Sequence, residues 1–370
     1  MSLADRWRAE LCRLQEQGRY RQLAVGSGID FTSNDYLGYT SRFQPTMISA
    51  PPSGTASRLL RGHHPVWDEV ESRLAQWHGA EAAIIMNSGY TANEGLLTTI
   101  IRPEDWVASD EHNHASLIDG IRASRAQKFI YRHQDLNHLE DGLRQAVRVS
   151  DRECFIVTES LFSMDGDLTP LRELAELADR YGAHLIVDEA HATGCFGITG
   201  GGRVDELGLR ASVLATVHTG GKALAVGGAY IVGSRLLRDW LVNHCRHLIY
   251  TTALPPLLGP LWLTALERVT KDNEGRQRLH ENSRFFRQSV QHEQISLLGS
   301  QYIIPIVLGD DRQAVNVART LQQRGFDIRP IRPPSVPPGT ARLRISIHAD
   351  HDPSDLRRLA ATIRELLTPS

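Results

Sequence analysis

The sequence lacks the features that mark secreted, membrane-spanning and metal-binding proteins. Its four cysteines are scattered without CxxC spacing, so the pattern predicts neither a disulfide framework nor a zinc ribbon, and no metal site is expected. No apolar run reaches the roughly 18 residues that span a bilayer, and the charged segment 1–18 is unlike a signal peptide. These absences predict a cytoplasmic protein that does not associate with membranes.

An excess of charge of one sign is also lacking. Lys and Arg number 41 against 43 Asp and Glu, a formal net charge of -2, and no basic stripe is present to bind nucleic acid. Internal repeats and low-complexity segments are absent. At about 150 residues per domain, the 370 residues suffice for two or three domains with sizeable cores. Small molecules or proteins are therefore the expected partners.

Helical segments alternate with short apolar strands between about residues 65 and 235. This alternation predicts an α/β fold, with a large domain over residues 45–255 in which helices flank a mostly parallel sheet. A small α+β domain is expected from residues 1–44 together with 256–370, opened by an amphipathic helix within 3–18. The predicted strands of the large domain are 82–86, 106–109, 155–158, 184–187, 213–217 and 229–232.

Reactive side chains follow most of these strands, where ligands of open α/β sheets bind. Asp188 and His191 follow one predicted strand, and Lys222 follows the next one along the chain. An amine among glycines and apolar residues would be partly desolvated, which lowers its pKa and makes it a nucleophile. An Asp and a Lys at two strand ends suit a pyridoxal phosphate (PLP) enzyme. The lysine would form a Schiff base, and the carboxylate would keep the pyridine nitrogen protonated.

Each of these residues taken alone has an ordinary explanation. An Asp after a strand commonly caps a helix, and a Lys beside two glycines is commonly a solvated loop residue. Gly221-Lys222 leaves an NTPase open, although the first glycine and the Ser or Thr of a P-loop are missing. A binding module without catalytic activity is the other alternative, and a purified protein that takes up no PLP would favour it.

Six ordered motifs resemble one family over nearly the whole chain. They lie at 34–38, 88–93, 114–116, 158–167, 187–194 and 219–224. These motifs are similar to those of the α-oxoamine synthases, PLP-dependent transferases of aminotransferase fold type I. The resemblance implies condensation of an amino acid with an acyl thioester, with loss of carbon dioxide, in a homodimer whose active sites lie at the subunit interface.

The resemblance also implies roles for single residues. Lys222 would form the Schiff base and later remove the Cα proton, and Asp188 would pair with the pyridine nitrogen. His191 would bind the phenolic oxygen, while His114 would stack on the ring and contact the substrate. Glu159 lies where the family contacts the cofactor or an intermediate. The other implied cofactor contacts are Ser88, Gly89 and Tyr90 at a helix start, Ser163, Thr219, and Thr251 with Thr252, which would reach the neighbouring subunit's phosphate.

The implied substrate contacts lie toward the two chain ends. Arg344, assisted by Asn34, would hold the amino-acid carboxylate, since a guanidinium binds a carboxylate through two parallel hydrogen bonds. Arg21, Arg332 and Ser335 resemble positions that contact the acyl group. Segment 331–344 is most like that of members that join L-alanine to a pimeloyl thioester in biotin biosynthesis. The alternative is another α-oxoamine synthase, such as 2-amino-3-ketobutyrate ligase, which uses glycine and acetyl-CoA, or a synthase of another long-chain aminoketone.

Two questions stay open from the sequence. The family usually has Leu or Phe where Gly220 stands, and Gly220, the unusual His218 and Ser160 therefore leave the shape of the pocket uncertain. The thioester carrier is also open between coenzyme A and acyl carrier protein. An acidic carrier would need only a local basic patch such as Arg122 and Lys128, with Arg125 between them, although these residues equally suit a solvated helix face.

Overall fold

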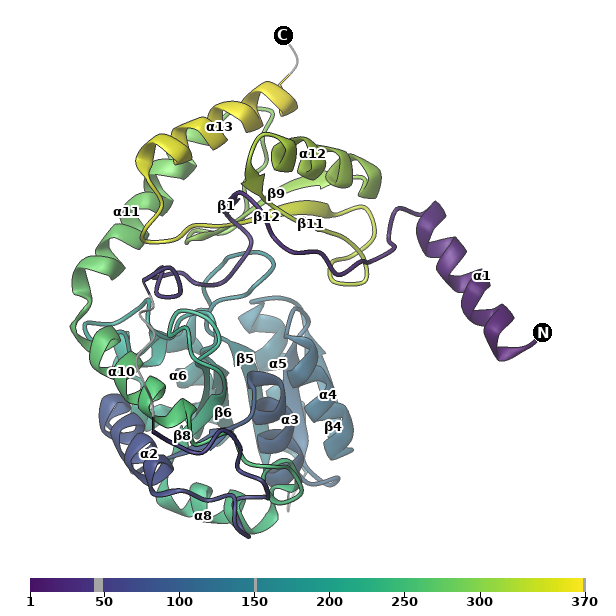
Figure 1. The fold of residues 1–370 in the computed structure, drawn as a ribbon. Coiled ribbons are helices and arrows are strands. Elements are labelled where there is room, and N and C mark those ends of the chain that lie inside the picture. Colours follow the sequence, from purple (N-terminus) through teal and green to yellow (C-terminus); the bar gives the residue numbers. More distant parts are fainter. Residues whose placement is uncertain (43–48, 150–151, 369–370) are drawn as a thin grey trace. The chain divides into compact units, whose positions relative to one another are not determined.

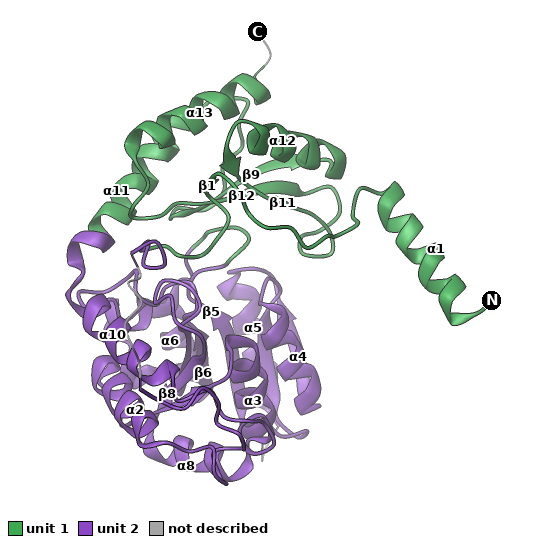
Figure 2. Ribbon diagram, viewed as in Figure 1, with its two compact units in different colours: residues 1–36, 163–167, 277–370 green, residues 37–162, 168–276 purple. Residues whose placement is uncertain are grey.

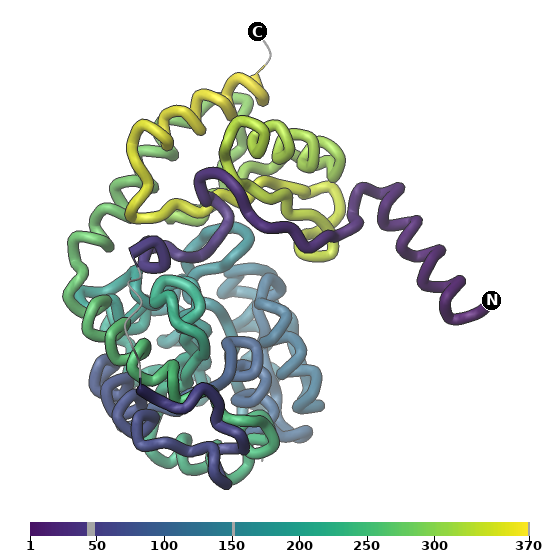
Figure 3. Tube along the Cα trace, viewed as in Figure 1, coloured from purple at the N-terminus to yellow at the C-terminus, as the bar shows by residue number. Residues whose placement is uncertain are grey.

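The computed structural model describes residues 1–42, 49–149 and 152–368, and the chain divides into two compact units. The larger unit comprises residues 37–162 and 168–276, and the smaller unit comprises 1–36, 163–167 and 277–370 (Figure 2). Both end segments of the chain therefore belong to the smaller unit, where Figure 3 shows them in purple and yellow.

These boundaries differ from the predicted ones. The larger unit begins before residue 45 and continues past 255, because the hydroxyl of the buried Tyr39 donates a hydrogen bond to Asp272 Oδ2 (2.9 Å) after helix α10 (Leu258–Lys271). Segment 163–167 belongs to the smaller unit, where Asp165 pairs with Arg342 at 2.5 Å. Both contacts join residues far apart in the sequence, so no local pattern could indicate them.

A seven-stranded sheet forms the centre of the larger unit, in the order β2-β8-β7-β6-β5-β3-β4 (Figure 1). Strand β8 is antiparallel to both of its neighbours, and the remaining pairs are parallel. All six predicted strands are present within two residues of their expected ends, which confirms the mostly parallel sheet. The strands are β2 (Ala82–Met86), β3 (Trp106–Asp110), β4 (Gln127–Tyr131), β5 (Cys154–Glu159), β6 (His184–Asp188), β7 (Ala215–Thr219) and β8 (Ala229–Gly233).

Strand β4 was not predicted from the sequence. It lies at the edge of the sheet and pairs only with β3 among the described strands. Gln127, Lys128 and Ile130 are exposed, so the strand has neither a continuous apolar run nor a clean alternation. Its position in the sheet therefore depends on pairing rather than on a local signal.

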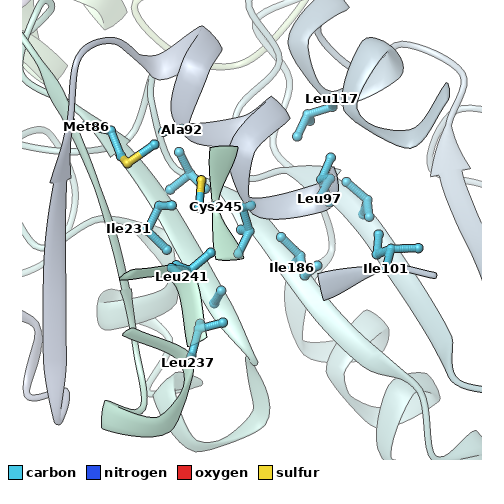
Figure 4. Packing of buried hydrophobic residues seen from close by; sticks show 14 of the residues in the cluster. Met86, Ala92, Leu97, Ile101, Leu117, Ile186, Ile231, Leu237, Leu241 and Cys245 are labelled. Carbon is cyan, nitrogen blue, oxygen red and sulfur yellow. The ribbon is translucent and has the colours of Figure 1, made fainter. Parts of the chain in front are cut away.

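Helices cover both faces of this sheet, as the alternation predicted. Along β6, Ile186 packs into one hydrophobic cluster, while Leu185 and Val187 pack into another, because neighbouring side chains of a strand point to opposite faces. The first cluster includes Leu97 of α3 and Leu241 of α8 (Figure 4). The helices of this unit are α2 (Pro65–His78), α3 (Gly89–Ile100), α4 (Ala115–Ser124), α5 (Leu136–Ala146), α6 (Leu171–Tyr181), α7 (Arg203–Glu206), the 3₁₀ helix η1 (Arg210–Ser212), α8 (Arg235–His244), α9 (Arg246–Ile249) and α10.

The smaller unit combines a three-stranded antiparallel sheet with helices, as predicted. The sheet has the order β11-β12-β9, and a separate parallel pair joins β1 to β10. Among the described residues, no helix is both long and apolar enough to cross a membrane. The elements are α1 (Leu3–Glu16), β1 (Ile29–Asp30), α11 (Asn273–Val290), most of which lies in this unit, β9 (Ile303–Gly309), α12 (Asp311–Gln323), β10 (Phe326–Asp327), β11 (Pro330–Ile331), β12 (Ala341–Ser346) and α13 (Pro353–Leu367).

The predicted opening helix is present as α1, and its start is well defined. Ser2 caps the helix in a reciprocal pair of hydrogen bonds with Asp5. No residue of α1 is buried, and its apolar side chains Leu3, Trp7 and Leu11 are 51%, 62% and 46% exposed. The helix therefore presents an apolar face to solvent in the single chain.

Candidate active site

Three neighbouring parallel strands bring reactive groups to one edge of the large sheet. Glu159 at the end of β5 is in register with Asp188 at the end of β6, which is in register with Val217 of β7. The loop that carries Lys222 follows β7, and the loop that carries His114 follows β3. Because the carboxyl ends of parallel strands meet at one edge, side chains from distant parts of the sequence gather there.

Asp188 is a buried carboxylate with two hydrogen-bond donors. Oδ2 accepts from Asn93 Nδ2 at 2.6 Å, and Oδ1 accepts from the backbone N–H of Ala190 at 2.8 Å. Asn93 is itself held, since Nδ2 also donates to Ser116 Oγ (2.9 Å). These donors offset the cost of removing a negative charge from water and fix the direction of the carboxylate.

Lys222 lies next to His191 in the larger unit. The distance between Lys222 Nζ and His191 Nε2 is 2.8 Å. An ammonium group carries only donors, so a charged Lys222 makes Nε2 of His191 the acceptor. Both side chains are set in turns that follow adjacent strands, and Lys222 is only partly exposed.

Lysine is rare in this chain, so few residues other than Lys222 could form a Schiff base with a cofactor. Only three lysines occur, Lys128, Lys222 and Lys271. Lys128 is exposed on the edge strand β4, and Lys271 is 73% exposed and pairs with Glu267 at 2.8 Å. Lys222 is therefore the lysine that is both partly buried and placed at the strand ends.

His114 and Glu159 complete this edge. The backbone N–H of His114 donates to Glu159 Oε1 (2.7 Å), and its Nδ1 lies 2.8 Å from Ser116 Oγ. Burial lowers the pKa of His114, with a further lowering from Lys222 and an opposing effect from Asp188. Burial also raises the pKa of Glu159 well above its usual range, and the charge of Asp188 adds to this shift. The neutral, protonated form of Glu159 is thus favoured beside Asp188.

The start of α3 provides a possible anion site at the same edge. Ser88 caps the helix, with its Oγ accepting from the backbone N–H of Thr91 at 3.2 Å. A Cβ atom on Gly89 would lie 3.7 Å from Cβ of Thr219, so the helix start faces the end of β7. Backbone N–H groups at a helix start together with hydroxyls are a common arrangement for phosphate binding.

Tyr90, Thr251 and Thr252 surround this helix start. The ring of Tyr90 meets that of His114 edge-on, with 6.2 Å between centroids, and its hydroxyl donates to Asp119. Asn87 Nδ2 donates to Thr251 Oγ1 (3.1 Å) and to the carbonyl oxygen of Thr252 (3.0 Å). Both threonines therefore lie beside the α3 start of their own chain, and their contact with a neighbouring subunit stays a prediction.

In the smaller unit, Arg344 and Asn34 come together as expected. Arg344, buried on β12, donates from Nη2 to Asn34 Oδ1 (2.9 Å) and from Nε to the carbonyl oxygen of Ser163 (2.6 Å). The hydroxyl of the fully buried Tyr36 lies 3.3 Å from Nη2, and Nη1 donates to Ser346 Oγ (3.0 Å). These contacts hold the guanidinium in one orientation.

Arg21, Arg332 and Ser335 form a second group in this unit. Arg21 Nη2 lies 3.5 Å from Ser335 Oγ, and Arg332 donates to the carbonyl oxygen of Gly18. Burial lowers the pKa of Arg332, and the nearby charges of Arg21 and Arg19 lower it further, against the opposing effect of Asp311. Asp311 also pairs with Arg19 at 2.6 Å. Arg332 thus lies near two other arginines, and Asp311 pairs with one of them, which leaves an excess of positive charge.

The comparisons with known proteins identify the family. The model of the class I and II aminotransferases matches residues 27–363. The 8-amino-7-oxononanoate synthase of Chlorobaculum parvum is 41% identical over 381 residues, which cover 96% of each chain. The chain belongs to the 8-amino-7-oxononanoate synthases. It is accordingly a PLP-dependent acyltransferase of the α-oxoamine synthase family, as the six motifs implied.

Solved structures support the same fold. The 8-amino-7-oxononanoate synthase of Francisella tularensis is 29% identical, with a TM-score of 0.76 and coverage of 91% of this chain and 97% of that chain. A serine palmitoyltransferase variant from S. paucimobilis with a bound PLP–myriocin aldimine is 26% identical, with a TM-score of 0.89 and coverage of 99% and 98%. The predicted fold type is thereby confirmed.

Several residues that contact the predicted site residues were not singled out from the sequence. Asn93 could have been found, because it lies one helical turn after Gly89 and therefore shares its face of α3. Tyr36 and Glu189 gave no such signal. Glu189 is fully buried and accepts from Ser160 Oγ (2.8 Å) and from the backbone N–H of Val204 (2.6 Å). The hydroxyl of Ser160, a residue that departs from the family pattern, therefore serves as a hydrogen-bond donor to this buried carboxyl group.

The unusual His218 also has a structural role. Its Nδ1 lies 2.8 Å from Thr193 Oγ1 and its Nε2 lies 2.7 Å from Thr216 Oγ1, so both ring nitrogens are partnered inside the larger unit. Burial lowers the pKa of His218 well below its usual value, and His78 adds to this effect. A neutral, fully buried imidazole thus braces the turn that contains His191.

Proposed function

We propose that this synthase condenses L-alanine with a pimeloyl thioester to give 8-amino-7-oxononanoate, carbon dioxide and free thiol in biotin biosynthesis. The observation that carries the proposal is the Lys222–His191 pair at the sheet edge that also holds Asp188. An amine, an imidazole and a buried carboxylate at one edge are the groups that PLP chemistry with an amino acid requires.

The residues of the larger unit fit PLP by the chemistry of their donors and acceptors. Lys222 supplies an amine for the cofactor's aldehyde, and Asp188 supplies a carboxylate for the pyridine nitrogen. The helix start at Ser88 and Gly89, with Thr219 facing it, supplies N–H groups and hydroxyls for the phosphate. His191 would bind the phenolic oxygen, and His114 would lie against the ring.

Lys222 acts as the base at the amino acid's Cα. When bound, PLP withdraws electrons from that carbon and makes its proton acidic. His191, at 2.8 Å, keeps Lys222 Nζ directed to one side and can share its proton. Asn93 and the backbone N–H of Ala190 donate to Asp188 and hold its carboxylate in one direction. The carboxylate can therefore hold a proton on the ring nitrogen.

The smaller unit supplies the substrate groups. Arg344, oriented by Asn34 and the carbonyl oxygen of Ser163, would bind the carboxylate of alanine. The cluster of Arg19, Arg21 and Arg332 would bind the far carboxylate of the pimeloyl chain. Its three positive charges exceed the single negative charge of Asp311. An acetyl group has no such second charge, so this cluster favours a diacid substrate over acetyl-CoA.

The assay that tests the proposal compares substrate pairs with purified holoenzyme. We expect thiol release and carbon dioxide with L-alanine and pimeloyl-CoA, and little of either with glycine and acetyl-CoA. The reverse preference would overturn the substrate assignment but leave the chemistry of the family in place.

Pimeloyl-acyl carrier protein is tested as a third acyl donor, in place of pimeloyl-CoA. Arg122 pairs with Asp119 at 3.2 Å, so its charge is partly offset, and we expect Arg122→Ala to alter neither thioester's KM.

A further inference from the structure

The loop between β7 and β8 holds Lys222 in a conformation that needs outside support. Residue Ala225 has a φ of 53°, a left-handed conformation that is uncommon for a residue with a side chain. The loop is closed by hydrogen bonds from Val226 N to the carbonyl oxygen of Gly220 and from Ala225 N to that of Lys222, both 2.9 Å long. Gly220 therefore lies at the base of the turn that carries the lysine.

A tryptophan from a distant helix takes the place of a side chain at Gly220. A Cβ atom on Gly220 would lie 2.6 Å from Cη2 and Cζ2 of Trp262 and 2.5 Å from the carbonyl oxygen of Val226. Trp262 belongs to α10 and is fully buried. A side chain at position 220 would therefore meet both the indole and the backbone of its own loop.

Trp262 also contacts the far end of the same loop. Its Nε1 donates to the carbonyl oxygen of Gly227 at 3.0 Å, and a Cβ on Gly228 would lie 3.5 Å from its Cζ2. The indole meets the ring of Tyr230 on β8 edge-on, with 5.6 Å between centroids. One rigid side chain therefore braces both ends of the loop that holds the lysine.

We propose that Trp262 is a positioning residue for Lys222. The absence of a side chain at Gly220 leaves the room that the indole occupies. This inference rests on the proposed role of Lys222 as the cofactor's lysine. The two positions form a complementary pair, in which a large side chain at 262 requires none at 220. Removal of the indole should loosen the loop, and addition of a side chain at 220 should displace it.

The test is a double-mutant cycle read by PLP binding to the apoprotein. Trp262→Ala and Gly220→Leu should each weaken PLP affinity by about tenfold or more, and each should shift the pH midpoint of the lysine-bound cofactor's visible absorbance. The double variant should lose less PLP affinity than the two single losses added together, because its leucine meets the carbonyl oxygen of Val226 but no longer meets the indole. Trp262→Phe, which keeps much of the ring but not the Nε1 donor, should lie between wild type and Trp262→Ala.

The matched control is Trp106→Ala. Trp106 is also buried, but it lies at the start of β3, where it stacks on Phe129, and β5 and β6 separate β3 from β7. This variant should lower the Tm of the apoprotein without moving PLP affinity or the pH midpoint. The proposal is overturned if Trp262→Ala and Trp262→Phe behave like Trp106→Ala, or if the losses of the two single variants simply add in the double variant. A wild-type protein without a lysine-bound chromophore would instead contradict the role of Lys222.

Discussion

At the scale of single residues, the arginines of the smaller unit offer the sharpest test of acyl recognition. Arg21→Ala should raise the KM for pimeloyl-CoA by about tenfold or more, the effect of losing one hydrogen bond to a charged group. The KM for L-alanine should stay unchanged, because Arg344 serves that substrate. The measurement is initial-rate kinetics with pimeloyl-CoA and with heptanoyl-CoA, whose chain end is uncharged.

The uncharged substrate separates recognition from general damage. Arg21→Ala should leave turnover of heptanoyl-CoA at the wild-type level, since no carboxylate is present to lose its partner. Arg358→Ala, an exposed arginine that pairs with Asp355 on α13, is the control and should match wild type with both substrates. Equal losses with the two acyl chains would rule out the cluster as the site of the far carboxylate.

His351 links protonation to the stability of the smaller unit. Its Nδ1 accepts from the backbone N–H of His348 (3.0 Å) and its Nε2 lies 2.8 Å from the carbonyl oxygen of Asp30, so the neutral ring is fully partnered. Burial and His348 lower the pKa of His351 to about 4. The folded form therefore resists protonation, and its stability should fall as pH drops from about 6.5 toward 4, by about 3 kcal/mol at most.

Urea unfolding of the apoprotein across this pH range measures that loss. His351→Gln, which has no titrating group, should be less stable near neutral pH but should lose less stability on acidification. His292→Gln, at an exposed histidine of the same unit, should follow the wild-type curve. A His351→Gln curve parallel to that of wild type would show that other groups cause the acid sensitivity.

At the scale of elements, the sequence predicts what repeats locally and misses what depends on distant partners. Strands such as β2 and β6 are predicted closely because apolar runs buried on both faces leave a strong local signal. Strand β4 is missed because an edge strand with exposed Lys128 lacks that signal. The unit boundaries shift because Tyr39 and Asp165 find partners far along the chain.

The candidate site likewise contains residues that local motifs predict and residues whose contacts depend on distant partners. Asp188, His191 and Lys222 stand directly after strands, so motif and spacing predict them, and the structure brings Lys222 to His191. Asn93 and Trp262 act through side chains of separate helices, and their contacts exist only once α3 and α10 pack on the sheet. A missing side chain at Gly220 is visible in the sequence, but its replacement by an indole is visible only in the fold.

At the scale of the whole molecule, we expect a homodimer in which each subunit completes its partner's site. The exposed Leu3, Trp7 and Leu11 of α1 give the single chain an apolar face of the kind that an interface covers. Thr251 and Thr252 are the residues proposed to reach the partner's phosphate. Mixed dimers test this directly, because two different inactive variants can share one intact site only if residues cross between subunits.

The experiment refolds Lys222→Ala together with a Thr251→Ala, Thr252→Ala double variant. If the threonines serve the partner, hybrid dimers contain one site with all wild-type groups, and activity should return to a substantial fraction of wild type. If the threonines serve their own chain, as their contact with Asn87 also allows, each site of the hybrid keeps one defect and activity should stay absent. Separately refolded variants provide the baseline.

The central claim of this account is that Lys222 carries the cofactor, and the rarity of lysine makes it directly measurable. Borohydride reduction of the holoenzyme fixes PLP on the lysine that holds it, and peptide mass mapping then locates the label among Lys128, Lys222 and Lys271. We predict the label on Lys222 alone, its loss in Lys222→Ala, and its retention in Lys128→Ala and Lys271→Ala. A label on Lys128 or Lys271, or a labelled Lys222→Ala protein, would contradict the account.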